Sequence, residues 1–235
     1  MRLRPLLSVA VAVAVVAAAC SGVVTTTTVD SSVIGAPIGS EVAGDSAPVT
    51  RADATANDAA REPITMSLTL YRLLNADGLG TERSTEEIAE IGERVNEVWA
   101  QAGIRFDPLL VRDIEVPAEA IGPIIVAGDI DPLLDSFASG IDVPDAGQLN
   151  GFYVSEAFGV NGFAPIGTRI FFVVDEPSVP DHRVTSHEIG HLFGLHHDLG
   201  DPGRLMFSGT DGEALVEREQ LVARYFAEGI LDGAR

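Results

Sequence analysis

Residues 187–197 read His-Glu-Ile-Gly-His-Leu-Phe-Gly-Leu-His-His, which fits the pattern H-E-x-x-H-x-x-G-x-x-H. Residues four apart lie on one face of a helix, so His187 and His191 can bind the same ion. Glu188 lies beside that face, within reach of a water molecule on the ion. Gly194 permits a backbone angle that other residues resist, and the resulting turn brings His197 back as a third imidazole.

Three imidazole nitrogens predict one zinc ion with an open position, which distinguishes a catalytic zinc site from a structural one. The alternative is a helix whose histidines only form hydrogen bonds, but it gives no account of Gly194. Of the two adjacent histidines, the spacing selects His197 over His196 as the ligand. His182 lies off the face of His187, and we expect it on the surface or in a loop.

The charge of the chain excludes one class of partner. Its 235 residues include 35 acidic and 15 basic side chains, with a formal net charge of −20. Binding to nucleic acid needs clustered positive charge, so we expect no nucleic-acid partner. Because Cys20 is the one cysteine, neither an intramolecular disulfide nor a cysteine-rich zinc ribbon is possible.

Residues 1–20 are organised as a signal peptide. Two arginines precede an apolar run, residues 5–19, that is too short for a comfortable membrane span. Cys20 follows directly and resembles the lipidated cysteine of a bacterial lipoprotein, although Ala17 stands where that signal usually has leucine. An ordinary signal peptide with an incidental cysteine is the alternative. Both predict an extracellular or cell-surface protein, and the first adds a lipid anchor on Cys20 that holds it to a membrane.

Residues 21–62 differ in composition from the rest of the chain. They are rich in Thr, Ser, Gly, Ala, Asp and Pro and contain no aromatic residue, so they cannot bury enough apolar surface to offset ordering. We predict a flexible linker, and a short pro-segment that blocks the site is the alternative. Residues 63–235 then form one folded domain.

The first half of this domain shows alternating strand and helix patterns. Residues 64–74 alternate in polarity and predict a strand. A helix opens with a capping residue at Thr85 and ends at Gly103, and a second strand runs from 104 toward 111. Four prolines interrupt residues 113–148, where we expect loops and a short helix.

The second half predicts two more strands and two helices. Residues 151–155 predict a strand and residues 168–174 a buried strand, and residues 159–167 suit an edge strand or a bulged loop. The motif helix covers 184–195, and a last helix covers 213–231. The order of elements predicts a mixed α/β (α+β) domain. The apolar face of the last helix consists of Leu215, Val216, Leu221, Val222, Tyr225 and Phe226.

The extended motif resembles the signature of the metzincin clan of zinc endopeptidases. Those enzymes carry a tight turn with a methionine beneath the zinc, and Met206 stands nine residues past His197, within the range of that turn. The resemblance makes Met206 a hydrophobic floor and not a ligand. Asp198, directly after the third histidine, resembles the reprolysin (adamalysin) branch. The segment Gly162-Phe163-Ala164 resembles the edge strand with which the clan pairs its substrate.

The resemblance implies a metzincin-like catalytic domain with a twisted mixed sheet, an edge strand, a zinc-binding helix, a methionine turn and a C-terminal helix. It also implies the chemistry: zinc held by His187, His191 and His197 activates a water molecule, with Glu188 as the general base. We therefore expect a zinc-dependent endopeptidase, a monomer, that acts on protein or peptide substrates.

Two other functions use the same residues. The first is a catalytically idle surface-binding module that keeps the metal for structure, although an intact Glu188 speaks against it. The second is a zinc hydrolase that acts on a non-peptide amide. Acidic loops at residues 129–131 and 198–201 offer carboxylates to calcium, but solvated acidic loops are the commoner explanation, and we assign no calcium site to them.

Overall fold

The computed structural model describes residues 62–138 and 148–233. The expected signal peptide 1–20, with Cys20, and all of the expected linker except Glu62 lie outside the described residues, so these assignments stay predictions. Within the described ranges, no helix has both the length and the apolar character needed to cross a membrane.

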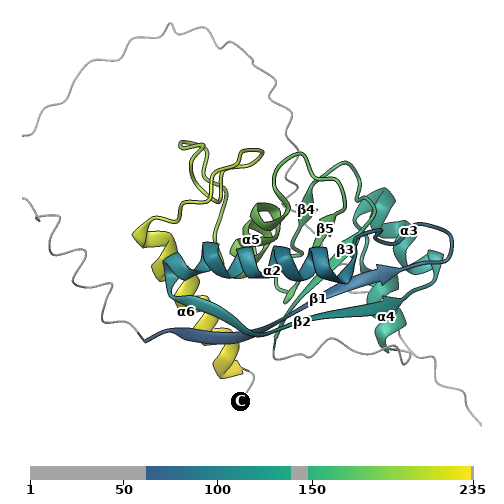
Figure 1. The fold of residues 1–235 in the computed structure, drawn as a ribbon, viewed down its shortest axis with the longest axis horizontal. Coiled ribbons are helices and arrows are strands. Elements are labelled where there is room, and N and C mark those ends of the chain that lie inside the picture. Colours follow the sequence, from purple (N-terminus) through teal and green to yellow (C-terminus); the bar gives the residue numbers. More distant parts are fainter. Residues whose placement is uncertain (1–61, 139–147, 234–235) are drawn as a thin grey trace, which may run out of the picture.

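The five strands form one mixed sheet in the order β2-β1-β3-β5-β4 (Figure 1). Neighbouring strands run parallel except for β4, which pairs antiparallel with β5 at the edge. This confirms the mixed α/β fold and the edge strand expected from the sequence. The strands are β1 (Ile64–Leu74), β2 (Ile104–Glu115), β3 (Leu149–Val154), β4 (Gly162–Phe163) and β5 (Ile170–Val174).

The helices cover both faces of this sheet. Helices α2, α5 and α6 pack with one face in the larger core cluster, and α3 and α4 pack with the other face in the smaller one. In Figure 1, α2 crosses in front of the sheet with α5 beside it. The helices are α2 (Thr85–Trp99), followed by the 3₁₀ turn η1 (Ala100–Ala102), α3 (Ala118–Ala127), α4 (Asp131–Ala138), α5 (Asp181–Leu192) and α6 (Glu217–Gly233).

The N-cap of helix α2 lies one residue before the position that the sequence predicted. Ser84, and not Thr85, is the N-cap: its side chain accepts from the backbone of Glu87, whose carboxylate accepts from the backbone of Ser84. This reciprocal capping box satisfies two backbone donors at the helix start. Gly103 ends the helical segment in the left-handed conformation, with φ of 63°.

A row of stacked aromatic rings holds the edge strand in place on the α3 side of the sheet. Phe163 of β4 stacks on Phe172 of β5 with ring centroids 4.7 Å apart. Phe172 continues the row to Phe152 at 5.3 Å, and Phe152 to Tyr71 at 5.2 Å. Such pairs contribute about 0.5–1.5 kcal/mol beyond the area that they bury. A strand of only two residues is therefore anchored by its side chain as well as by its backbone.

Residues 113–148 hold more regular structure than predicted. Strand β2 continues to Glu115 because it stays paired with the whole of β1, although its alternation of polarity is lost on the exposed edge. Helix α3 forms in spite of Pro123, which removes one backbone donor from its interior. The burial of Ile121 and Ile124 against the sheet offsets this loss. Residues 139–147 lie outside the described parts.

The apolar face predicted for the last helix is confirmed only in part: Leu215 is buried and Val222 packs against the larger core cluster, but the other four side chains are exposed. Helix α6 starts at Glu217 rather than at residue 213, and its buried residues are Ala223 and Ala227. Small residues let the helix pack closely on η1 and β1, and Val222, Ile230 and Leu231 pack against the same core from its sides. The side chains of Leu221, Tyr225 and Phe226 are 44%, 74% and 43% exposed, and that of Val216 is 40% exposed.

Candidate metal centre

Helix α5 carries the first two motif histidines and ends before the third. It begins and ends three residues earlier than predicted, and Gly194 accounts for its end. Gly194 has φ of +73°. Its N–H donates to the carbonyl of His191, and the next N–H donates to the carbonyl of Gly190. This Schellman arrangement satisfies two of the last helical carbonyls and reverses the chain, so that His197 returns toward the helix.

The three imidazoles meet at one point. The candidate ligand atoms of His187, His191 and His197 all lie within 4.8 Å of one another. The Nε2 atoms of His191 and His197 are 3.2 Å apart, and two nitrogens on one tetrahedral zinc ion are separated by about 3.3 Å. Within the described residues, no other group of three or more His, Cys, Asp or Glu side chains is arranged to hold a metal ion.

Backbone carbonyls orient two of the three rings. The Nδ1 atom of His187 lies 2.7 Å from the carbonyl oxygen of Leu205, and the Nδ1 atom of His191 lies 2.9 Å from that of Leu195. A carbonyl oxygen only accepts, so each Nδ1 carries the proton and each Nε2 presents a lone pair.

The same burial that encloses the rings keeps them neutral. Burial lowers the pKa of His187 well below its usual value and lowers the pKa of His191 to about 4. Burial also lowers the pKa of His197. All three imidazoles are therefore uncharged at pH 7, which is the form that binds a cation. The donor set, its spacing and its protonation fit a zinc ion.

Glu188 lies between α5 and the edge strand, and its side chain is fully buried. Gly162 of β4 makes room for it. A Cβ atom on Gly162 would stand 3.1 Å from Cγ of Glu188, 2.9 Å from a methyl group of Val184 and 2.8 Å from the backbone of β5. A larger residue at this position would push β4 away from α5. Gly162 thus keeps the edge of the sheet next to the carboxylate and the histidines.

A tight turn at Arg204–Phe207 places Met206 beneath α5. The N–H of Phe207 donates to the carbonyl of Arg204 at 3.2 Å, which closes the turn. Met206 is fully buried, and a Cβ atom on Gly190 would stand 2.6 Å from its sulfur. Gly190 lies between the first two motif histidines along α5. The methionine therefore packs against the part of α5 that lies between the first two motif histidines.

The three residues expected to pair with a substrate differ in their surroundings. Gly162 and Phe163 form β4, whose outer edge has no neighbouring strand among the described residues. The Phe163 side chain is buried in the aromatic row, so only its backbone is offered at the edge. Ala164 is also buried and lines a pocket beside the histidines.

Sequence reasoning missed Arg183, which lies one helical turn before His187. Arg183 is buried, at 2% exposed, and its Nη2 atom donates to the carbonyl of Leu205 at 2.7 Å. That carbonyl also accepts from Nδ1 of His187. The guanidinium further donates to the carbonyls of Phe207 and Gly212. Arg183 thus holds the methionine turn and the acceptor of a candidate ligand in one network.

We expect replacement of Arg183 with methionine to lower the free energy of unfolding by about 3 kcal/mol. Hydrogen bonds from a charged donor contribute about 1.5–3 kcal/mol, and the buried carbonyls lose their partner. Urea denaturation of the metal-free protein measures the change. Arg94→Met, at an exposed position of α2, is the matched control and should stay within about 0.5 kcal/mol of the parent. Equal midpoints for both variants would contradict the network.

The expectation for His182 is wrong. It is not a surface or loop residue but a buried one in the first turn of α5, at 5% exposed. Its Nε2 atom lies 2.6 Å from Oε1 of Glu213. This contact joins α5 to the chain that follows the methionine turn, and it spans 31 positions of sequence. No local pattern around His182 could have revealed its partner.

Asp198 belongs to a network of charges next to the third histidine. Hydrogen bonds from the backbone N–H groups of Gly200 and Asp201 lower the pKa of its carboxyl group. Its second oxygen lies 3.4 Å from the guanidinium of Arg204, which also pairs with Glu219 at 2.6 Å. The N–H of Asp198 donates to the carbonyl of Met206. The chain after His197 is therefore fastened to both the methionine turn and the start of α6.

Two further groups lie outside the cluster. His196 is exposed, next to the half-buried His197. The acidic loops at residues 129–131 and 198–201 form internal turns instead of an open ring of carboxylates. The Asp129 side chain accepts from the backbone of Asp131.

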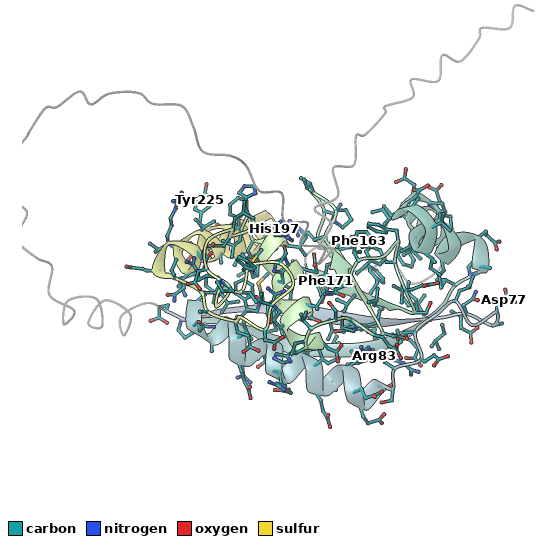
Figure 2. The ribbon with its side chains drawn as sticks, turned by 90° about the horizontal axis from the view of Figure 1, so that it is seen from above. Asp77, Arg83, Phe163, Phe171, His197 and Tyr225 are labelled. Carbon is teal, nitrogen blue, oxygen red and sulfur yellow. The ribbon has the colours of Figure 1, made fainter. Side chains whose placement is uncertain are left out.

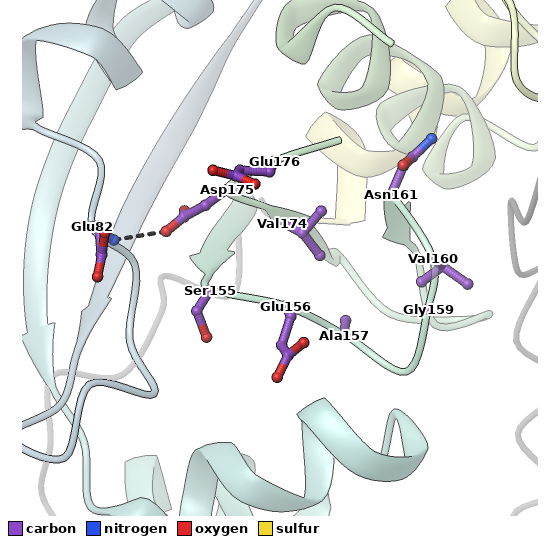
Figure 3. Close-up of a pocket in the computed structure, with 10 residues that line it drawn as sticks. All are labelled: Glu82, Ser155, Glu156, Ala157, Gly159, Val160, Asn161, Val174, Asp175 and Glu176. Carbon is purple, nitrogen blue, oxygen red and sulfur yellow. Dashed lines mark hydrogen bonds between the residues drawn. The ribbon is translucent and has the colours of Figure 1, made fainter. Parts of the chain in front are cut away.

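Two pockets differ in what they offer to chemistry. One, of about 590 Å³, opens beside His191 and His197. The other, of about 460 Å³, lies at the carboxyl ends of β3 and β5, and Figure 3 shows its acidic side chains. In the acidic pocket Asp175 accepts from the backbone of Glu82 at 2.7 Å, and no histidine is among the described residues that line it. The first pocket therefore adjoins the metal centre, as does a smaller hollow of about 330 Å³ that is lined by His197 but not by His191.

Comparisons with known proteins add little to this geometry. The chain matches no family model and no curated protein. Among the solved structures that match is metalloproteinase-II from Bacteroides fragilis, at 13% sequence identity and a TM-score of 0.49. The match covers 70% of this chain and 53% of that one, so this chain spans about half of that protein. A likeness this distant decides nothing about the activity of the present chain.

Proposed function

We propose that this chain is an exported, zinc-dependent endopeptidase of the metzincin type, with Asp198 favouring the reprolysin branch. One observation carries the proposal: three neutral imidazoles converge on one point beside a buried glutamate and a sheet edge that has no partner strand in residues 62–138 and 148–233. A metal kept only for structure would usually have a fourth protein ligand. No fourth His, Cys, Asp or Glu joins this group among the described residues.

The outer edge of β4 supplies the binding surface for a peptide. An extended peptide can add to such an edge through backbone hydrogen bonds, which hold it without regard to most of its side chains. Gly162 brings this edge against α5, so the peptide backbone would pass close to Glu188 and the three histidines. We therefore infer peptide and protein substrates rather than small amides.

The roles of the residues follow from their positions. His187, His191 and His197 would hold the zinc ion. When bound, zinc supplies a Lewis acid that lowers the pKa of a coordinated water molecule toward about 7 and polarises the scissile carbonyl group. Glu188 accepts the proton of the attacking water and then delivers it to the nitrogen of the leaving amine. Its burial between α5 and β4 keeps bulk water away from the carboxylate.

The proposal extends to the location of the protein. A signal peptide over residues 1–20 would export the chain, and lipidation of Cys20 would anchor it to a membrane. Residues 21–62 would then act as the linker that separates the catalytic domain from the membrane surface. Mass spectrometry of the mature amino terminus, from membrane and soluble fractions, tests both steps.

Removal of the metal gives the direct test of the function. We expect the purified protein to cleave a mixed peptide library, to lose at least about 99% of this activity after dialysis against a chelator, and to regain it with one equivalent of zinc. Zinc content is measured on the same samples. A protein that binds one zinc ion and cleaves nothing would instead be the idle surface-binding module. Cleavage that survives complete loss of metal would also contradict the proposal.

A further inference from the structure

The pocket beside the histidines joins three parts of the fold. Its volume is about 590 Å³, which lies within the range of pockets that enclose a ligand group. One wall follows directly after β4, a second is the turn at the end of α5, and the third is α6. The lining residues on which the argument depends are Ala164, Ile166, Arg169, His191, His197 and Phe226.

Large apolar side chains face this pocket from opposite walls. Ile166 is 75% exposed on the first wall, and Phe226 is 43% exposed on α6. The Phe226 ring lies against Gly194, since a Cβ atom there would stand 2.5 Å from the ring. The turn at Gly194, which directs His197, therefore also packs against the Phe226 ring on one side of the pocket. Apolar surface that faces water in this way is stabilised by an apolar occupant.

The pocket is continuous with the metal centre. His191 and His197 line it, so an occupant lies next to the bond that reacts. In the view of Figure 2, His197 projects between Tyr225 of α6 and Phe163 of β4. Because residues 164–169 of the pocket wall follow β4 directly, a peptide on the outer edge of β4 would meet the pocket at the end of that strand.

The direction of β4 tells which half of the peptide meets the pocket. The chain runs from Gly162 through Phe163 into the wall at Ala164–Arg169, so the pocket lies at the carboxyl end of the strand. Antiparallel pairing is the more stable arrangement per residue. A peptide bound antiparallel to β4 places its amino-terminal half at the carboxyl end of the strand, and hence at the pocket.

We propose that this pocket binds a large apolar side chain, such as Phe or Leu, from the amino-terminal side of the scissile bond, and that this contact sets the cleavage preference. The inference rests on the proposed endopeptidase function. Ile166 and Phe226 are the specificity-determining residues. An aromatic or branched aliphatic group would cover the two side chains and remove them from water.

Arg169 is the one charged side chain of the Asp, Glu, Lys or Arg type among the described lining residues. Its positive charge does not make the pocket a binding site for acidic side chains. Its guanidinium reaches the end of α6, where a Cβ atom on Gly233 would stand 3.3 Å from Nη2. There Arg169 shares a second hollow with Glu228 and Asp232. These two carboxylates line that second hollow and not the pocket itself, and their negative charge beside Arg169 opposes the binding of an acidic side chain.

Peptide cleavage with matched variants tests the proposal. A library varied at three positions on each side of the scissile bond is digested by the full-length, zinc-loaded protein. We expect kcat/KM for Phe or Leu to exceed that for Ala by about 10-fold on the amino-terminal side. Ile166→Ser should remove most of this preference. Val126→Ser is the control, because Val126 is 79% exposed on α3 and outside the pocket. Phe226→Ala is a second pocket variant.

A binding measurement separates this inference from the proposed function. Acetylated tripeptides ending in Phe or Ala are titrated calorimetrically into the zinc-loaded parent and Ile166→Ser proteins. Tighter binding of the Phe peptide, lost in Ile166→Ser, supports the pocket even if no peptide is cleaved, and then only the protease assignment fails. Three results would overturn the inference while leaving the protease assignment intact, provided that the protein cleaves peptides. They are equal binding of the two tripeptides, a cleavage preference confined to the carboxyl side of the scissile bond, and a cleavage preference for acidic residues.

Discussion

Glu188→Gln is expected to lower kcat for peptide cleavage by about 10²–10⁴-fold, the contribution usual for general acid–base catalysis, while zinc content stays at one equivalent. Glutamine fills the same buried volume between α5 and β4 but cannot accept the proton of the attacking water. The ligands are untouched, because His187 and His191 keep their carbonyl partners at Leu205 and Leu195. Initial rates on one fluorogenic peptide, with metal analysis of the same protein, measure both quantities.

Glu156→Gln is the matched control for this experiment. Glu156 lines the acidic pocket of Figure 3, is exposed, and lies away from the histidine cluster. We expect this variant to retain the parent rate. A Glu188→Gln protein that cleaves at the parent rate would remove Glu188 from the chemistry. Loss of rate in Glu156→Gln alone would move the active site to the acidic pocket.

Local patterns in the sequence predicted the parts of the site that are held by local geometry. The spacing of His187 and His191 follows from the period of one helix. The turn at Gly194 ends that helix through a bond from Gly194 to His191 and one from Leu195 to Gly190, three and five positions back. Strand β1 was also predicted with its observed bounds, because its alternation of polarity is strong and both ends meet turn residues. In each case the physical cause lies within one element.

Features that depend on distant partners were not predictable in this way. The buried His182 contacts Glu213, 31 positions later, and Arg183 is held by carbonyls 22 to 29 positions later. Helix α3 contains Pro123, which as a local signal argues against a helix, yet burial against the sheet outweighs it. The burial of Ala223 and Ala227 on α6 was not predictable from the sequence either. A pattern of apolar residues points to the largest side chains as the buried face, and several of these are exposed here.

His197→Ala is expected to weaken zinc binding by more than about 100-fold, whereas His196→Ala should change it by less than about threefold. Loss of a residue that only orients a ligand typically weakens metal binding by 10–100-fold, and loss of the ligand itself should exceed that range. The Nε2 atom of His197 lies 3.2 Å from that of His191, but the adjacent His196 is exposed. Competition with a chromogenic chelator gives the dissociation constants.

The pair of variants also tests the turn that positions the third ligand. Both substitutions remove one imidazole from neighbouring positions of the same segment, so general effects on folding should be similar and are checked by thermal unfolding of the metal-free proteins. A Schellman turn at Gly194 directs one of the two side chains back toward α5 and the other outward. Equal dissociation constants for the two variants would mean that this direction is wrong. The cluster would then lack its third ligand, and with it the basis for zinc-dependent hydrolysis.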